Sequence, residues 1–131
     1  MFVINLFAAL ALLAAPGAAP DAVIGQWSNA KGTVEVRTHR CGANLCGRVV
    51  RASPKQEAAA RKAGTASLVG TELLKNYRQE RDGTWTGRVF IPKIGRDVPS
   101  QIKQTSNDTL TISGCMLGGL LCKTQVWHRV P

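Results

Sequence analysis

The alternation of apolar and polar residues predicts a chain built mainly from β-strands. From about residue 23 onward, short alternating runs are separated by residues that favour turns. In one run Val34 and Val36 lie on one face, and Glu35, Arg37 and His39 lie on the other. Such a two-residue period is typical of a half-buried strand. The predicted strands are 23–28, 33–39, 47–51, 70–79, 84–91, 97–105, 109–113 and 121–130.

One segment, SPKQEAAARK at residues 53–62, interrupts this alternation. Ser53 is a favourable N-cap, Pro54 stands at the first helical position, and the alanine run that follows favours a helix. Gly64 comes just after its end. We therefore predict one short helix between the third and fourth strands.

The connections between most of the strands are short, which favours antiparallel neighbours in chain order. An open sheet would leave two unpaired edges, whereas closure of the eight strands removes them. The pattern therefore predicts an all-β fold: a small eight-stranded up-and-down antiparallel barrel with one short helix. No repeat or linker divides residues 23–131, so we expect a single domain there. Pro99 within a strand indicates an edge or a bulge.

The N-terminal segment resembles a secretory signal. Residues 2–15 contain no charged residue, yet this run is shorter than the roughly 20 residues of a membrane-spanning helix. Small residues and prolines follow it, as at the end of a signal peptide. We expect residues 1–22 to be a signal peptide cleaved between Gly17 and Ala22. The mature protein would then be periplasmic or secreted, with no transmembrane segment.

The four cysteines favour two disulfides over a metal site, because an even number in a small exported chain is typical of a disulfide framework. Pairing of Cys41 with Cys46 and of Cys115 with Cys122 would close short loops, worth about 2 kcal/mol each, whereas crossed pairing would be worth about 4 kcal/mol. The arms of a hairpin keep paired Cα atoms close enough to bridge, so we expect the local pairing. No metal or other cofactor is expected.

The formal net charge of +9 bears on the partners of the protein. Such a surface attracts anionic molecules, which outside the cytoplasm would be lipid headgroups or glycans; a well-solvated basic surface without a partner is the alternative. Aromatic residues make up only 5% of the chain. Because single-stranded nucleic acid is bound largely by aromatic stacking, we do not expect it as a partner.

Catalytic chemistry is not expected from the sequence. The only histidines, His39 and His128, have no Ser or Asp partner nearby, and the carboxylates are scattered along the chain. None of the usual hydrolase, metalloprotease or phosphate-binding motifs occurs. An uncharacterised hydrolase is a lower-ranking alternative to a non-enzymatic protein.

A small barrel can hold one ligand or can be filled by its own side chains. The alternation places a set of apolar residues inside, which would line a ligand cavity or form an ordinary core: Val34, Val36, Trp85, Val89, Val98, Ile102, Leu110, Ile112 and Trp127. On the last strand Lys123, Gln125, Trp127 and Arg129 share one face. If that face points inward, it would add a cationic end suited to a carboxylate or phosphate.

Several spaced motifs support a family resemblance. They are GQW at 25–27, CGANLCGRVV at 41–50, TWTG at 84–87, GC at 114–115, LCKTQ at 121–125 and WHR at 127–129. With these motifs, residues 25–129 resemble the secreted bacterial family called domain of unknown function 2147. The resemblance implies a lipocalin-like barrel and no established chemistry. In lipocalins a first-strand tryptophan closes one end under a basic residue, which implies barrel closure by Gly25, Trp27 and Arg129.

Two functions follow from these expectations. The first is a non-enzymatic exported binding protein that holds a small hydrophobic or amphipathic ligand in the barrel. The alternative is a basic envelope-associated module that contacts anionic lipid or glycan and has a filled core. The sequence does not fix an oligomeric state.

Overall fold

The structure, a computed structural model, describes residues 21–131 of the chain. The predicted signal peptide therefore lies outside the described residues, except for residues 21 and 22. No helix between residues 21 and 131 has both the length and the apolar character needed to cross a membrane.

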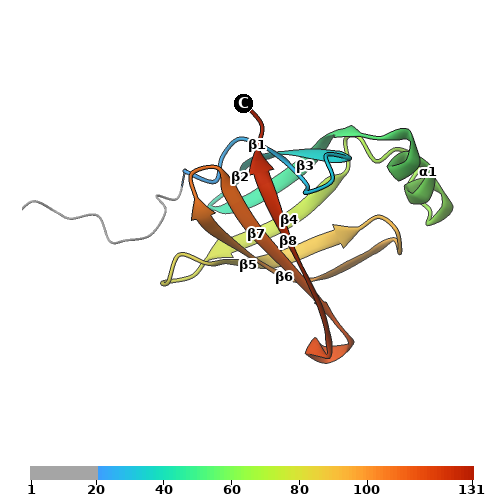
Figure 1. Ribbon diagram of the computed structural model, residues 1–131. Helices are drawn as coiled ribbons and strands as arrows, with labels where there is room; N and C mark the ends of the chain where they lie inside the picture. Colours follow the sequence, from blue (N-terminus) through green and yellow to red (C-terminus); the bar gives the residue numbers. More distant parts are fainter. Residues whose placement is uncertain (1–20) are drawn as a thin grey trace, which may run out of the picture.

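The described chain forms one closed antiparallel barrel, in which each strand pairs with its neighbours in chain order and β1 pairs with β8 (Figure 1). The strands are β1 (Gln26–Ser28), β2 (Val34–Cys41), β3 (Asn44–Ala52), β4 (Glu72–Gln79), β5 (Trp85–Ile91), β6 (Arg96–Ser106), β7 (Thr109–Met116) and β8 (Leu121–Arg129). The predicted fold class is confirmed. A 3-10 turn, η1 (Leu117–Gly119), joins the last two strands.

The helix α1 (Pro54–Lys62) forms where the sequence predicts it. The Ser53 hydroxyl accepts a hydrogen bond from the Gln56 backbone N–H at 3.3 Å, which caps the first turn. The helix and the loop that follows it contribute Ala60 and Leu68 to the hydrophobic core, both fully buried. The helix is thus fixed to the barrel by packing as well as by the chain.

Strand boundaries differ from the prediction by three residues at three places and by at most two residues elsewhere. The first strand starts at Gln26 instead of residue 23, because the carbonyl of Val23 accepts a hydrogen bond from the Trp27 indole N–H (3.0 Å) and the chain bends around that ring. The third strand begins at Asn44 instead of residue 47, because Gly42, with a φ of 67°, lets the chain reverse within residues 42–43.

Residues 114–116, predicted as loop, belong to β7, where Gly114 pairs with Lys123. Glycine has no side chain to continue the alternation, so the sequence pattern ends too early. The resulting hairpin is longer than predicted.

Glu35 joins the outer faces of three strands. Its carboxylate accepts hydrogen bonds from Arg51 on β3 and from Gln26 on β1. These hydrogen bonds, chiefly the one from Arg51, hold the pKa of the Glu35 carboxyl below its usual value. The Gln26 hydrogen bond thus joins the short β1 to β2, and the ion pair with Arg51 joins β2 to β3.

Candidate functional site

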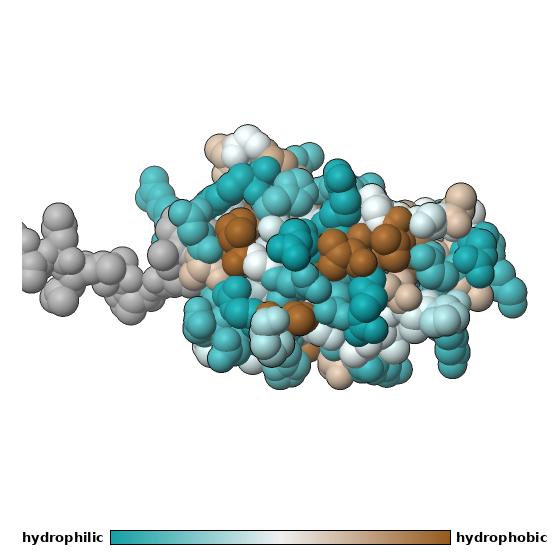
Figure 2. Space-filling view, turned by 90° about the horizontal axis from the view of Figure 1, so that it is seen from above, coloured by the Kyte–Doolittle hydropathy of each residue, from teal (hydrophilic) through white to brown (hydrophobic). Residues whose placement is uncertain are grey.

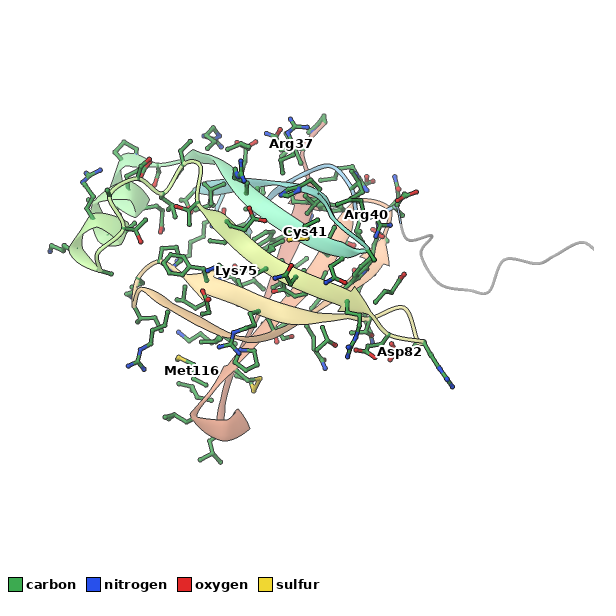
Figure 3. The ribbon with its side chains drawn as sticks, turned by 180° about the vertical axis from the view of Figure 1, so that it is seen from behind. Arg37, Arg40, Cys41, Lys75, Asp82 and Met116 are labelled. Atoms are coloured by element: carbon green, nitrogen blue, oxygen red, sulfur yellow. A yellow bond between two sulfur atoms is a disulfide. The ribbon has the colours of Figure 1, made fainter. Side chains whose placement is uncertain are left out.

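The connections between strands fall into two groups at opposite ends of the barrel, because neighbouring strands are antiparallel. We call one the open end; its connections are residues 29–33, 53–71, 92–95 and 117–120. We call the other the closed end; it comprises residues 21–25 and the connections 42–43, 80–84 and 107–108. Figure 3 shows Arg40 and Asp82 toward the closed end and Met116 at the open end.

Trp27 and Arg129 lie in contact at the closed end. The Arg129 guanidinium lies over the fully buried Trp27 ring, 4.3 Å from its centroid. It also donates hydrogen bonds to the backbone carbonyls of Ala22 (2.6 Å), Ile24 (3.1 Å) and Asn107 (2.9 Å). A side chain at position 25 would collide with this guanidinium, which explains the glycine there. The three residues predicted to close the barrel therefore meet at this end.

A second tryptophan lies at the same end. The Arg40 guanidinium lies 5.5 Å from the Trp85 ring centroid and donates a hydrogen bond of 2.8 Å to Asp21. Trp85 itself is only 2% exposed. An arginine guanidinium thus lies close to each of the two indoles at this end.

The residues predicted to line a ligand cavity lie in the barrel core. The buried ones are Val36, Trp85, Val89, Val98, Ile102, Leu110, Ile112 and Trp127, and Val34 is half-buried against them. On the last strand only Trp127 is buried, while Lys123 and Gln125 are exposed. The structure thus places no cationic group from Lys123 inside the barrel. Ligand contact by the nine residues stays a prediction.

The glycines of the inner wall show how closely the barrel interior is packed. A Cβ atom added at Gly47 would lie 2.8 Å from Leu74 Cδ1 and 2.9 Å from Val36 Cγ1. One added at Gly87 would lie 2.7 Å from Tyr77 Cγ. Such distances are shorter than any ordinary carbon contact, so neighbouring side chains already fill the space in front of these glycines.

Tyr77 brings the one phenol of the chain into this core. Burial raises the pKa of the Tyr77 phenol, and the hydroxyl of Ser100 partly offsets that effect. Tyr77 is therefore neutral at physiological pH and acts as a large core side chain that lies against Gly87.

A groove of about 610 Å³ opens beside this core, at the open end. It forms because β6 and β7 separate: their pairing ends at Ser100 and Gly114. Beyond that point Arg96 to Pro99 pair only with β5 and residues 115–116 pair only with β8, so a wedge lies between the two hairpins. The groove is lined by Arg96, Asp97, Val98, Pro99, Cys115, Met116, Leu117, Gly118 and Gly119.

The walls of the groove are mainly apolar. Val98 and Met116 continue the core into it, and the Cys115–Cys122 disulfide stands beside them. One carboxylate, Asp97, is neutralised by Lys75, whose Nζ lies 3.0 Å away. Arg96 is exposed and forms no salt bridge with a carboxylate of the described chain. A ligand in this groove would therefore meet apolar surface and one unpaired positive charge.

Both disulfides join residues close in sequence, Cys41 with Cys46 and Cys115 with Cys122. The local pairing expected from hairpin geometry is thus present. Cys115 and Cys122 stand directly opposite each other on β7 and β8. The disulfide therefore holds together the hairpin that forms one wall of the groove.

The two histidines lie on the surface of the described part of the chain. His39 Nε2 lies 3.2 Å from a Glu72 carboxylate oxygen on the barrel surface. His128 is exposed near the end of β8. Across residues 21–131 there is no group of three His, Cys, Asp or Glu side chains placed to hold a metal ion.

Of the residues that line the groove, only Val98 was predicted from the sequence to line a ligand cavity. A signal for Met116 was present, since Leu110, Ile112 and Met116 keep the same alternation across Gly114. No such signal exists for Arg96, because the groove depends on where β6 leaves β7. That separation is a non-local property of the pairing.

The closed eight-stranded barrel, with an arginine over the first-strand tryptophan, defines a lipocalin-like fold. A solved structure, Protein HP1028 from the human pathogen Helicobacter pylori, described as belonging to the lipocalin family, shares this fold. The similarity has a TM-score of 0.63 at 12% sequence identity and covers 82% of each chain.

The chain belongs to the family described as "Uncharacterized protein conserved in bacteria (DUF2147)", whose model matches residues 25–129. The resemblance drawn from the spaced motifs is thus confirmed. No curated protein matches the chain.

Proposed function

We propose that this protein is a non-enzymatic, exported binding protein that takes up a small hydrophobic or amphipathic molecule at the open end of its barrel. The observation that carries the proposal is the apolar groove between β6 and the β7–β8 hairpin, with a volume of about 610 Å³. Binding sites for small molecules typically have volumes of about 300–1,000 Å³ and mostly apolar walls with a few polar groups. The groove fits that description.

The groove is a better ligand site than the barrel interior for a packing reason. A ligand inside the barrel would have to displace Tyr77 or Leu74 from their contacts with the inner glycines. Opening a close-packed core forfeits its van der Waals contacts and its burial of apolar surface. The groove needs no such displacement. We therefore place the ligand beside Val98 and Met116.

The charged residues at the groove indicate which kind of polar group the ligand would carry. Asp97 is paired with Lys75, while Arg96 is exposed. An arginine side chain presents a planar fork of donors that matches a carboxylate or a phosphate. An amphipathic molecule with an anionic head and a short alkyl chain therefore suits the groove better than a cationic one.

Two disulfides within a small bacterial chain support export to the periplasm or beyond. Disulfides form and persist in oxidising compartments and are rare in a reducing cytosol. The apolar N-terminal segment, interpreted as a signal peptide, agrees with this location. A periplasmic or secreted protein would meet amphipathic molecules of the cell envelope.

The groove is tested with dodecanoate as the probe, by isothermal titration calorimetry below its micelle concentration. Met116→Asp should weaken dodecanoate binding about tenfold, because it replaces an apolar wall by a negative charge. The matched control is Val126→Asp, which places the same charge on the exposed outer face of β8, away from the groove. Its dissociation constant should equal that of the wild type.

A second variant tests the anionic head. Arg96→Gln should weaken binding of dodecanoate about threefold, the scale of one exposed ion pair, and leave binding of dodecanol unchanged. Equal affinities of Met116→Asp and Val126→Asp would contradict the groove as the ligand site. Absence of dodecanoate and dodecanol binding by the wild type would contradict the proposed function.

A further inference from the structure

The tip of the β7–β8 hairpin exposes large apolar side chains to water. We call residues 116–121 the hairpin tip; within it Leu117 is 75% exposed, Leu120 is 88% exposed and Leu121 is 44% exposed. Single exposed leucines are common on protein surfaces, but clusters usually mark a contact with a membrane or a partner. The hairpin tip is such a cluster.

The fold presents the hairpin tip beyond the body of the barrel. Figure 1 shows the β7–β8 hairpin projecting away from the other strands. The Cys115–Cys122 disulfide joins the two arms directly below the tip. Gly118 and Gly119 take positive φ angles of 65° and 94°, which allow the chain to reverse within a few residues. The leucines therefore stand on a short, cross-linked support.

Exposed apolar residues are unevenly distributed over the two ends. Besides the tip leucines, the open end carries Ile94 (43% exposed) and Val69 (43% exposed) on its connections. The two remaining large exposed apolar residues, Val50 and Val126, lie on strands, and none lies on a closed-end connection of residues 21–131. Figure 2, a view from above, shows a mostly hydrophilic surface with scattered apolar side chains.

Charged residues are also unevenly distributed between the two ends of the barrel. The open-end connections contain the basic residues Lys31, Lys55, Arg61, Lys62 and Lys93 and the single acidic residue Glu57. The closed-end segments contain the acidic residues Asp21, Glu80, Asp82 and Asp108 and the basic residue Arg81, and Arg40 and Arg129 of the adjoining strands also lie at this end. The open-end connections are thus positive and partly apolar, whereas acidic and basic residues nearly balance at the closed end.

We propose that the open end docks on an anionic lipid bilayer, with the leucines of the hairpin tip inserted among the acyl chains near the headgroups. Basic side chains on separate connections suit a continuous negative surface, to which each contributes about 1 kcal/mol of attraction. The apolar residues stand on a projection, so a protein partner would have to supply a matching hollow. A bilayer accepts such a projection without a preformed pocket.

The hairpin tip and the groove share residues 116–119. Leu120 does not line the groove, so a substitution at this position tests the docking separately from ligand binding. If both proposals hold, the groove opens next to the inserted tip and hence next to the lipid surface.

Vesicle sedimentation measures the docking. The full mature protein should sediment with vesicles that contain phosphatidylglycerol and remain in the supernatant with phosphatidylcholine alone. Raising the salt concentration should release it, because the Debye length falls below about 10 Å above 0.1 M salt. Equal partitioning onto both kinds of vesicle would contradict the role of the basic open end.

Two matched pairs of variants separate insertion from charge. Leu120→Asp should lower the vesicle partition coefficient at least tenfold, because it removes the most exposed apolar side chain; Val126→Asp makes the same change in charge off the tip and should lower it much less. Lys93→Glu at the open end should lower it about fivefold or more, and Arg81→Glu at the closed end should leave it nearly unchanged.

A tryptophan introduced at the hairpin tip would report whether the tip inserts into the bilayer. The three native tryptophans, Trp27, Trp85 and Trp127, are 0%, 2% and 5% exposed, so their emission should change little on docking. Leu120→Trp adds one exposed indole, whose emission should shift to the blue when phosphatidylglycerol vesicles are added. If the variant binds the vesicles but its emission does not shift, the hairpin tip does not insert into the bilayer.

The remaining outcomes also decide the proposal. If Leu120→Asp and Val126→Asp partition equally, the tip does not insert. If the wild type dimerises without lipid and Leu120→Asp is monomeric, the tip contacts a second copy of the chain and docking on lipid is wrong. Unchanged dodecanoate binding by Leu120→Asp would show that a failure here leaves the groove intact.

Discussion

The Gly87→Ala variant is expected to lose about 2–3 kcal/mol of its free energy of unfolding, which is large for a single methyl group. The added Cβ would lie 2.7 Å from Tyr77 Cγ, 2.8 Å from the Lys75 carbonyl oxygen and 2.8 Å from Tyr77 Cα. Two of these neighbours are backbone atoms, so a rotamer change cannot relieve the contact. Thermal unfolding followed by circular dichroism should show a fall in Tm of about 10 °C.

Gly47→Ala is the matched control for this prediction. The nearest neighbours of its Cβ would all be side-chain atoms, Leu74 Cδ1 at 2.8 Å, Val36 Cγ1 at 2.9 Å and Leu74 Cγ at 3.0 Å. Side-chain atoms can move more easily than backbone, so we expect a smaller loss of stability. If Gly87→Ala unfolds at the wild-type temperature, the interior has spare room, and the argument that places the ligand outside it is wrong.

Arg129→Ala is expected to lose about 2–4 kcal/mol, since it removes charged hydrogen bonds and a cation–π contact together. The carbonyls of Ala22, Ile24 and Asn107 would lose their donor, and the Trp27 ring would be uncovered. Arg129→Lys should recover only part of the loss, because an ammonium lacks the planar fork that reaches the three carbonyls. Chemical denaturation measures both differences.

Arg81→Ala is the control for Arg129→Ala. Arg81 is an exposed arginine in the β4–β5 turn at the same end, and its removal should change the free energy of unfolding by less than about 0.5 kcal/mol. An effect of Arg129→Ala as small as that of Arg81→Ala would mean that the guanidinium does not stabilise the closed end.

Much of the barrel follows from local signals in the sequence. The alternation around Val34 and Val36 reflects one buried face, and short turns such as 81–83 force antiparallel neighbours. Ser53 and Pro54 mark the start of the helix through capping chemistry that involves only nearby residues. These signals depend on residues close together in the chain, so they can be interpreted without the structure.

The groove could not be predicted in the same way. Its shape depends on β6 leaving β7 at Ser100 and on the length of a hairpin that Gly114 conceals in the sequence pattern. Arg96 and Met116 lie on neighbouring strands beyond the point where β6 and β7 stop pairing, and both line the groove. The periodicity of the sequence predicts which side chains point into the barrel. It does not predict whether those side chains fill the barrel interior.

We propose that the ligand binds in the open-end groove and not inside the barrel. An NMR titration of the ¹⁵N-labelled protein with dodecanoate distinguishes the two locations. Chemical-shift changes are expected at the backbone amides of Arg96, Val98 and Met116, with Trp27 and Arg40 at the closed end unaffected. Changes centred on Val36 and the interior instead, with none at Arg96 or Met116, would contradict binding in the groove.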